Sequence, residues 1–120
     1  METVLFQYKD APGHTDLRLQ ATEKGVTVYC FSLFDANSLE TDICCSKPFS
    51  AEAFSRALHD LRAEGHCSLT QQDQMLAITK GPTGQHTLSF DGCGYNDHFV
   101  ITGLSIDADA ILDRLRKVVG

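Results

Sequence analysis

Residues 50–65, SAEAFSRALHDLRAEG, contain the long helical pattern that divides the chain into two halves. Their apolar residues recur at i, i+3, i+4 and i+7, the spacing that places side chains on one face of a helix: Phe54, Ala57, Leu58 and Leu61. Ser50 is a suitable N-cap, and Gly65 is a suitable stop just after the last turn. The stretch therefore predicts an amphipathic helix over residues 51–64.

Strand patterns come before this helix. Residues 16–21 alternate polar and apolar side chains, as a strand with one buried face does. Residues 26–34 are rich in β-branched and aromatic side chains, and residues 4–8 are apolar enough for a first strand. A shorter edge strand is predicted over residues 40–49, ending near Pro48, which has no N–H to donate.

The second half returns to strand patterns and closes with a helix. Four strands are predicted, at residues 66–70, 75–80, 85–90 and 98–106. An apolar stripe predicts a helix over residues 108–118, with Asp107 as its cap. The order of elements predicts one α+β domain over residues 1–120, in which an antiparallel, meander-like sheet of about six to eight strands carries two amphipathic helices.

The composition excludes several classes of function. Of 120 residues, 42% are hydrophobic and 22% are charged, as in an ordinary globular domain that folds without a cofactor. The 16 acidic and 10 basic residues give a net charge of −6, so nucleic acid is not an expected partner, because its binding relies on Lys and Arg. No segment approaches the ~18 apolar residues of a membrane span, and the N-terminus has no signal-peptide pattern. We therefore expect a cytoplasmic protein with no membrane partner.

The cysteines are odd in number and accompany no secretion signal, which indicates reduced thiols: Cys30, Cys44, Cys45, Cys67 and Cys93. No metal site is expected, because no Cys-x-x-Cys occurs and adjacent strand residues, such as His66 and Cys67, face opposite sides. No Gly-rich phosphate-binding motif occurs in the sequence, and no cofactor is expected.

The best catalytic candidate in the sequence is Cys93, which lies in a Gly-rich segment five residues before His98. A nucleophilic cysteine needs a base or a positive charge that lowers its pKa. Asp91 and Asp97 flank Cys93 and would raise its pKa instead. We therefore predict no catalytic residue, and we keep as alternatives a small enzyme using Cys93 and His98 and a generic protein-interaction or regulatory module.

Acidic residues gather in two stretches of the sequence. Residues 81–113 contain five acids and no Lys or Arg, and a second group lies at residues 35–42. Such stretches form either a solvated surface or a docking face for a basic protein partner, with nearby aromatic side chains as anchors. The second interpretation predicts these partner-binding residues: Phe34, Asp35, Glu40, Asp42, Asp91, Tyr95 and Asp97.

A further pattern runs through residues 48–115. It consists of PFSAEAF entering a helix, the run from Leu61 to Leu69, MLAI at 75–78, Gly84, LSF at 88–90 and a terminal amphipathic helix. This pattern resembles the small immunity proteins of bacterial polymorphic-toxin and contact-dependent growth inhibition systems, particularly the WapI-type group. The resemblance implies a non-enzymatic, cytosolic protein that binds and neutralises one cognate toxin domain. We expect that domain to be basic and nuclease-like, and the chain to be a monomer or a weak dimer.

Overall fold

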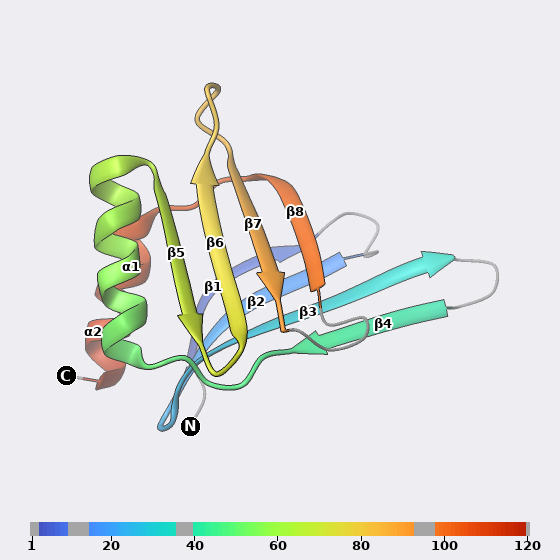
Figure 1. Ribbon diagram of the computed structural model, residues 1–120, viewed down its shortest axis with the longest axis horizontal. Helices are drawn as coiled ribbons and strands as arrows, with labels where there is room; N and C mark the ends of the chain where they lie inside the picture. The colour runs from blue at the N-terminus through green and yellow to red at the C-terminus, as the bar shows by residue number, and fades with distance from the viewer. Residues whose placement is uncertain (1–2, 10–14, 36–39, 93–97, 120) are drawn as a thin grey trace.

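Eight strands and two helices follow one another in the order ββββαββββα (Figure 1). The first half contains β1 (Thr3–Lys9), β2 (Thr15–Thr22), β3 (Gly25–Asp35), β4 (Glu40–Cys45) and α1 (Ala51–Glu64). The second half contains β5 (His66–Gln71), β6 (Gln74–Lys80), β7 (His86–Asp91), β8 (His98–Leu104) and α2 (Ala108–Val119). This computed structural model describes residues 3–9, 15–35, 40–92 and 98–119, of which residues 32–35, 40–44 and 119 are described by their backbone alone.

The strands form two antiparallel meanders of four strands each. Sheet A has the order β1-β2-β3-β4, and sheet B has the order β5-β6-β7-β8. The predicted α+β class is confirmed, as is the antiparallel pairing of strands that follow one another in the sequence. The strands divide between two sheets because α1 separates β4 from β5, and these two strands do not pair.

α1 begins and ends where the sequence predicts. The Oγ of Ser50 accepts a hydrogen bond from the N–H of Ala53 at 3.3 Å, and Gly65 follows the helix in the left-handed conformation, with φ of 81°. α2 starts in the same way, because Asp107 Oδ1 accepts a hydrogen bond from Ala110 N at 3.2 Å. Side-chain caps therefore set the start of both helices.

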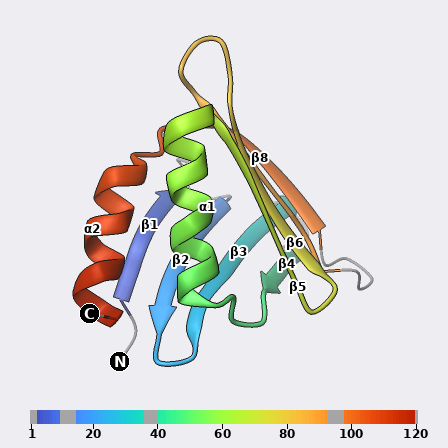
Figure 2. The same ribbon diagram turned by 60° about the vertical axis from the view of Figure 1, so that its left-hand side comes forward.

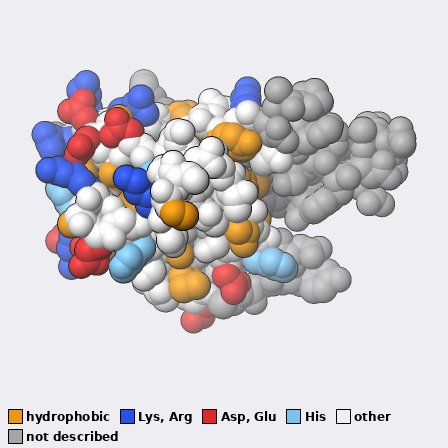
Figure 3. Space-filling model, turned by 90° about the horizontal axis from the view of Figure 1, so that it is seen from above, with side chains coloured by type: hydrophobic (Ala, Val, Ile, Leu, Met, Phe, Trp, Pro, Cys, Tyr) orange, Lys and Arg blue, Asp and Glu red, His pale blue; other side chains and the backbone are white. Residues whose placement is uncertain are grey.

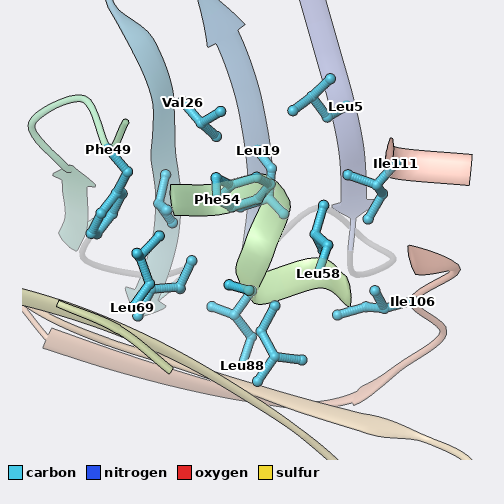
Figure 4. Packing of buried hydrophobic residues seen from close by; sticks show 14 of the residues in the cluster. Leu5, Leu19, Val26, Phe49, Phe54, Leu58, Leu69, Leu88, Ile106 and Ile111 are labelled. Carbon is cyan, nitrogen blue, oxygen red and sulfur yellow. The ribbon is translucent and has the colours of Figure 1, made fainter. Parts of the chain in front are cut away.

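The hydrophobic core lies between the two sheets, and α1 fills much of the space between them (Figure 4). Sheet A contributes Leu19 and Val26 from one side, and sheet B contributes Leu69 and Leu88 from the other. Phe54 of α1 lies among these side chains and is 1% exposed. Complete burial of an apolar side chain of this size stabilises the fold by about 1.5–3 kcal/mol.

Two glutamines of the β5–β6 hairpin hold the segment that leaves sheet A. Gln74 is buried, and its side chain donates to Lys47 O at 2.8 Å and accepts from Lys47 N at 3.1 Å. Gln71 accepts from Ser50 N at 2.9 Å and donates to Pro48 O at 3.2 Å. Sheet B therefore fixes the path of the chain from sheet A into α1.

The strand predicted at residues 40–49 ends earlier, at Cys45. The Oγ of Ser46 accepts the hydrogen bond of Val28 N at 2.8 Å, in place of a backbone carbonyl. Pro48 then has no N–H with which to continue the ladder. A side-chain acceptor and a proline together end β4.

The strand predicted at residues 98–106 also ends earlier, at Leu104. The N–H of Ile106 donates to Nδ1 of the buried His86 at 3.4 Å instead of extending the ladder. Gly103, with φ of 76°, lies in the irregularity that precedes this end.

Both helices lie on one side of the molecule, α1 beside β5 and α2 beside β1 (Figure 2). In the part of the chain that the structure describes, neither helix is long and apolar enough to cross a bilayer. The helices leave the outer faces of both sheets uncovered, and these faces are the largest candidate functional surfaces.

Candidate functional site

Four predicted partner-binding residues belong to one hairpin. Phe34 and Asp35 end β3, Glu40 and Asp42 lie in β4, and the Cα atoms of Asp35 and Glu40 are paired. This end of the hairpin lies on the side of the molecule away from the helices (Figure 1). The side chains of these four residues fall outside the described ones, so their contact with a partner stays a prediction.

Asp91 is the predicted partner-binding residue whose side chain the structure describes. It ends β7, it is exposed, and its Cα pairs with Met75 in β6 and with His98 in β8. Tyr95 and Asp97 lie outside the described residues. One residue of the predicted acidic group, Asp91, therefore lies on the outer face of sheet B.

The outer face of sheet B, which we call face B, is formed by the side chains that alternate with the buried ones. Most of them are exposed, and none is Lys or Arg. They form three rows across the sheet: Thr70, Met75, Asp91 and His98; Ser68, Ala77, Ser89 and Val100; His66, Thr79 and Thr87. Small hydroxyl and apolar side chains therefore cover most of face B, and Asp91 is its carboxylate.

Two large apolar side chains project from face B. Val100 is 66% exposed, and Met75 is 42% exposed. Val100 belongs to the unbroken apolar run Phe99-Val100-Ile101, whose other two members are half-buried on the inner face. Selecting candidates by charge does not find these residues. The unbroken apolar run is a signal that could have found Val100, because a strand with one solvated face alternates instead.

The net charge of the chain is unevenly distributed. Of the 16 acids and 10 bases, α1 and α2 hold five of each, which leaves eleven acids and five bases on the strands and connections. In Figure 3, the charged side chains gather at the helical end, and the middle of the molecule is mostly uncharged. The helical layer is thus neutral overall, and the rest of the chain carries the −6.

The outer face of sheet A, which we call face A, contains an ordered polar cluster. Asp16 in β2 accepts hydrogen bonds from Arg18 Nη2 at 2.7 Å and from Gln7 Nε2 at 3.2 Å. The guanidinium carbon of Arg18 lies 5.4 Å from the centre of the Tyr29 ring, in a cation–π contact. Burial raises the pKa of Asp16, but the bonds from Arg18 and Gln7 outweigh it and hold this pKa below its usual value.

Two open grooves border the helices. The larger has a volume of about 530 Å³ and lies between α1 and α2, where Leu112 and Leu115 meet Arg56, His59 and Arg116. The smaller has a volume of about 280 Å³ and lies at the start of α2. Ser55 and His59 of α1 both line the larger groove, but no hydrogen bond between them is among the described contacts.

His86 is a buried titratable group beside the smaller groove. Burial lowers its pKa, and the charge of Lys80 lowers it further, whereas a hydrogen bond to the backbone of Leu104 opposes this shift. Because its Nδ1 also accepts from Ile106 N, the imidazole fixes the chain between β8 and α2. Its role in the described contacts is structural.

Three thiols, those of Cys30, Cys45 and Cys67, lie among the described side chains. Cys30 and Cys67 are buried, and Cys45 is exposed. Burial raises the pKa of Cys67 to about 11, so this thiol stays protonated at neutral pH. Cys93 lies outside the described residues, and the described part of the chain contains no cluster of three or more metal-ligating side chains. A site built on Cys93 and the exposed His98 stays a prediction.

Comparison with known proteins shows the fold alone. No family model and no curated protein matches the chain. A solved structure described as "Crystal structures of trypanosoma bruciei MRP1/MRP2" matches 99% of this chain and 82% of that chain, with a TM-score of 0.64 and 12% sequence identity. At this identity the similarity extends to the arrangement of strands and helices and not to function.

Proposed function

We propose that this chain is a non-enzymatic binding protein that docks a partner protein on face B. The observation that carries the proposal is the chemistry of this face, which the described residues leave uncovered, which contains one carboxylate and no Lys or Arg, and on whose edge strand Val100 is 66% exposed. Interface centres are depleted in charged residues, and contiguous exposed apolar patches commonly mark contacts with partners.

The shape of face B favours a protein partner over a small molecule. Small ligands are held in concave sites that bury most of their surface. Face B is one side of a four-stranded sheet, and the grooves of the described residues lie elsewhere, beside the helices. A surface of this kind fits another broad protein surface.

The charge distribution supports a basic partner. Asp91 lies on face B, and the predicted acidic residues Asp35, Glu40 and Asp42 occur on the β3–β4 hairpin, outside the neutral helical layer. Complementary charge raises association rates by ~10- to 1,000-fold and makes them sensitive to salt.

The resemblance of residues 48–115 to immunity proteins supports the specific form of the proposal. In that form, the chain acts in the cytoplasm and neutralises a basic, nuclease-like toxin domain by binding it. Fast capture suits this role, because the toxin must be bound before it reaches its target. The acidic stretches of the chain provide the field that such capture needs.

The test identifies any toxin domain encoded beside the gene and measures its association with the purified chain by surface plasmon resonance. Met75→Lys places a positive charge on face B and should weaken binding by at least about tenfold. Val4→Lys is the matched control, because Val4 is also 42% exposed but lies on β1 of sheet A. Equal binding of both variants and the original chain would remove face B as the docking surface, and no binding by the original chain would contradict the immunity function.

A further inference from the structure

The edge of β8 is uncovered in the part of the chain that the structure describes. β8 is the last strand of sheet B, with β7 as its neighbour (Figures 1 and 2). Two other edge strands are flanked: β5 by α1 and β1 by α2, from which Arg114 Nη1 donates to Leu5 O at 2.6 Å. An uncovered edge presents unpaired N–H and C=O groups that can pair with another strand.

Two hydrogen bonds at one end of sheet B fix the direction of its backbone groups. Lys80 N donates to Gly65 O at 2.7 Å, toward β5, and Gly81 N donates to Gln85 O at 2.7 Å, toward β7. Backbone groups alternate in direction along a strand. In β7, the N–H and C=O groups of odd-numbered residues therefore point toward β6, and those of even-numbered residues point toward β8.

The register of β7 with β8 shows which groups of β8 point outward. Leu88 is paired with Ile101, and Phe90 is paired with Phe99, so Ile101 and Phe99 direct their N–H and C=O groups back to β7. Val100 lies between them and directs its N–H and C=O away from the sheet. The most exposed large apolar residue of the described chain thus also presents open backbone groups.

The side chains along this edge are apolar on both faces. Val100 is exposed on the outer face, and Phe99 and Ile101 are half-buried on the inner face. β8, from His98 to Leu104, contains no Lys, Pro or acidic residue, which are the side chains that commonly protect an edge from pairing. A strand added here would meet hydrogen-bonding groups along its edge and apolar groups on both of its faces.

We propose that β8 binds an extended segment of the partner protein as a fifth strand of sheet B. The segment is uncharged and rich in Val, Ile or Thr where it lies beside Val100, and it carries a basic residue at the end that lies beside His98, one strand away from Asp91. This inference rests on the proposed function, because it names how the partner docks beside face B. Backbone hydrogen bonds supply affinity, and the side chains on either face supply specificity.

Charge argues against a second copy of this chain as the added strand. Each copy carries −6, and pairing two β8 strands would also bring two Asp91 regions onto one continuous sheet. Like charges that face each other across an interface disfavour the pairing. A basic segment of another protein would instead be attracted to this acidic chain.

The test uses a synthetic peptide, acetyl-KTVTVTK-amide, so it needs no toxin. Val100→Pro removes the open N–H of β8 and leaves the bonds to β7 in place, since proline is tolerated where an edge N–H faces solvent. Val100→Thr is the matched control, because it keeps the N–H and the β-branched shape. Hydrogen exchange of the Val100 amide in the original chain and peptide affinity for all three proteins are measured, after thermal melts confirm that each is folded.

We expect the peptide to slow exchange of the Val100 amide by at least about tenfold, and Val100→Pro to bind at least about tenfold more weakly than Val100→Thr. The same peptide with its central amides N-methylated should not bind the original chain. Equal binding of the two variants, unchanged exchange at Val100, or binding of the methylated peptide would overturn the inference. Dimerisation through Val100, seen by sedimentation, would assign the edge to a second copy and overturn it as well. None of these outcomes decides whether a toxin binds face B, which the Met75 experiment measures separately.

Discussion

The two halves of the chain share the order ββββα but present opposite outer surfaces. On face A, Asp16 binds Arg18 and Gln7, and the Arg18 guanidinium lies over Tyr29. On face B, the exposed Val100 lies on the edge strand, beside a row of small neutral side chains. The difference shows that the alternation of buried and exposed positions builds each sheet, whereas the exposed positions remain open to different chemistry.

The inner surfaces of the two halves are alike, because both sheets must pack against the same core. Leu19 and Val26 of sheet A and Leu69 and Leu88 of sheet B are all buried around Phe54. Among the described side chains of face A, Asp16 pairs with Arg18 and Gln7, so this polar cluster has less to gain from a partner. Face B leaves apolar groups in water, and the edge beside it has open backbone groups. This contrast supports the proposal that a partner docks on the second half.

The largest expected effect is a difference in the free energy of unfolding between glycine variants of two hairpins, β2–β3 in the first half and β6–β7 in the second. Gly25 has φ of 135°, and a Cβ at this position would lie 2.1 Å from Phe49 O. Gly25→Ala should lower the free energy of unfolding by about 3 kcal/mol or more, because the backbone of the crossing segment must move. Gly84, with φ of 86° and open space around it, is the control, and Gly84→Ala should cost about 1 kcal/mol. Urea denaturation measures both, and equal losses would show that the crossing at Phe49 is not rigid.

Local sequence patterns predicted much of the fold, because caps and periodicity act over a few residues. Ser50, Gly65 and Asp107 marked helix boundaries that the structure confirms. The division into two sheets has no local signal, since it depends on which strands pair across α1. The early end of β4 depends on the Ser46 side chain taking a backbone donor of Val28, which no periodic pattern reveals.

The candidate surface was harder to predict than the fold. Charge singled out Asp91, which does lie on face B, but it could not single out Met75 or Val100. A Ser/Thr-rich strand face resembles an ordinary solvated one until its neighbours across the sheet are known. The buried Gln74 and His86 were missed for the same reason, because their partners come from distant segments.

Loss of the contact between the halves at Gln74 should have the next largest effect on the free energy of unfolding. Gln74→Leu keeps the volume of the side chain but removes both hydrogen bonds to Lys47. We expect a loss of about 1–3 kcal/mol in the free energy of unfolding, because the part-buried backbone N–H and C=O of Lys47 lose their partners. Gln85→Leu alters an exposed glutamine and should change stability by less than about 0.5 kcal/mol. A Gln74→Leu protein as stable as the original would mean that the two halves do not depend on this clamp.

A smaller effect should appear in the pH dependence of stability, through His86 in the second half. The pKa of His86 in the folded chain lies below its ordinary value of 6.5, so folding favours the neutral imidazole. Its contribution to stability is complete above about pH 6.5 and is lost as the pH falls through the folded pKa. Chemical denaturation from pH 8 to pH 5 should therefore show a decline that His86→Gln reduces. Parallel profiles for the two proteins would contradict this assignment. Asp16, in the first half, acts in a separate pH range. Its lowered pKa contributes stability that is lost only as the pH falls below the ordinary value of 3.8.

The smallest expected effect tests whether face A is structural. Arg18→Gln breaks the ion pair with Asp16 and the contact with Tyr29, yet Arg18 is 34% exposed, so the loss of stability should be small and should shrink in high salt. Arg56→Gln is the control, because Arg56 lies 3.9 Å from Glu52 in an exposed pair on α1 and should contribute no more than about 0.5 kcal/mol. Neither variant should change the association rate with a basic partner by the margin expected for Met75→Lys, since neither lies on sheet B. If Arg18→Gln alone weakened binding as strongly as Met75→Lys, the ordered cluster would be a docking anchor, and the assignment of function to the second half would be wrong.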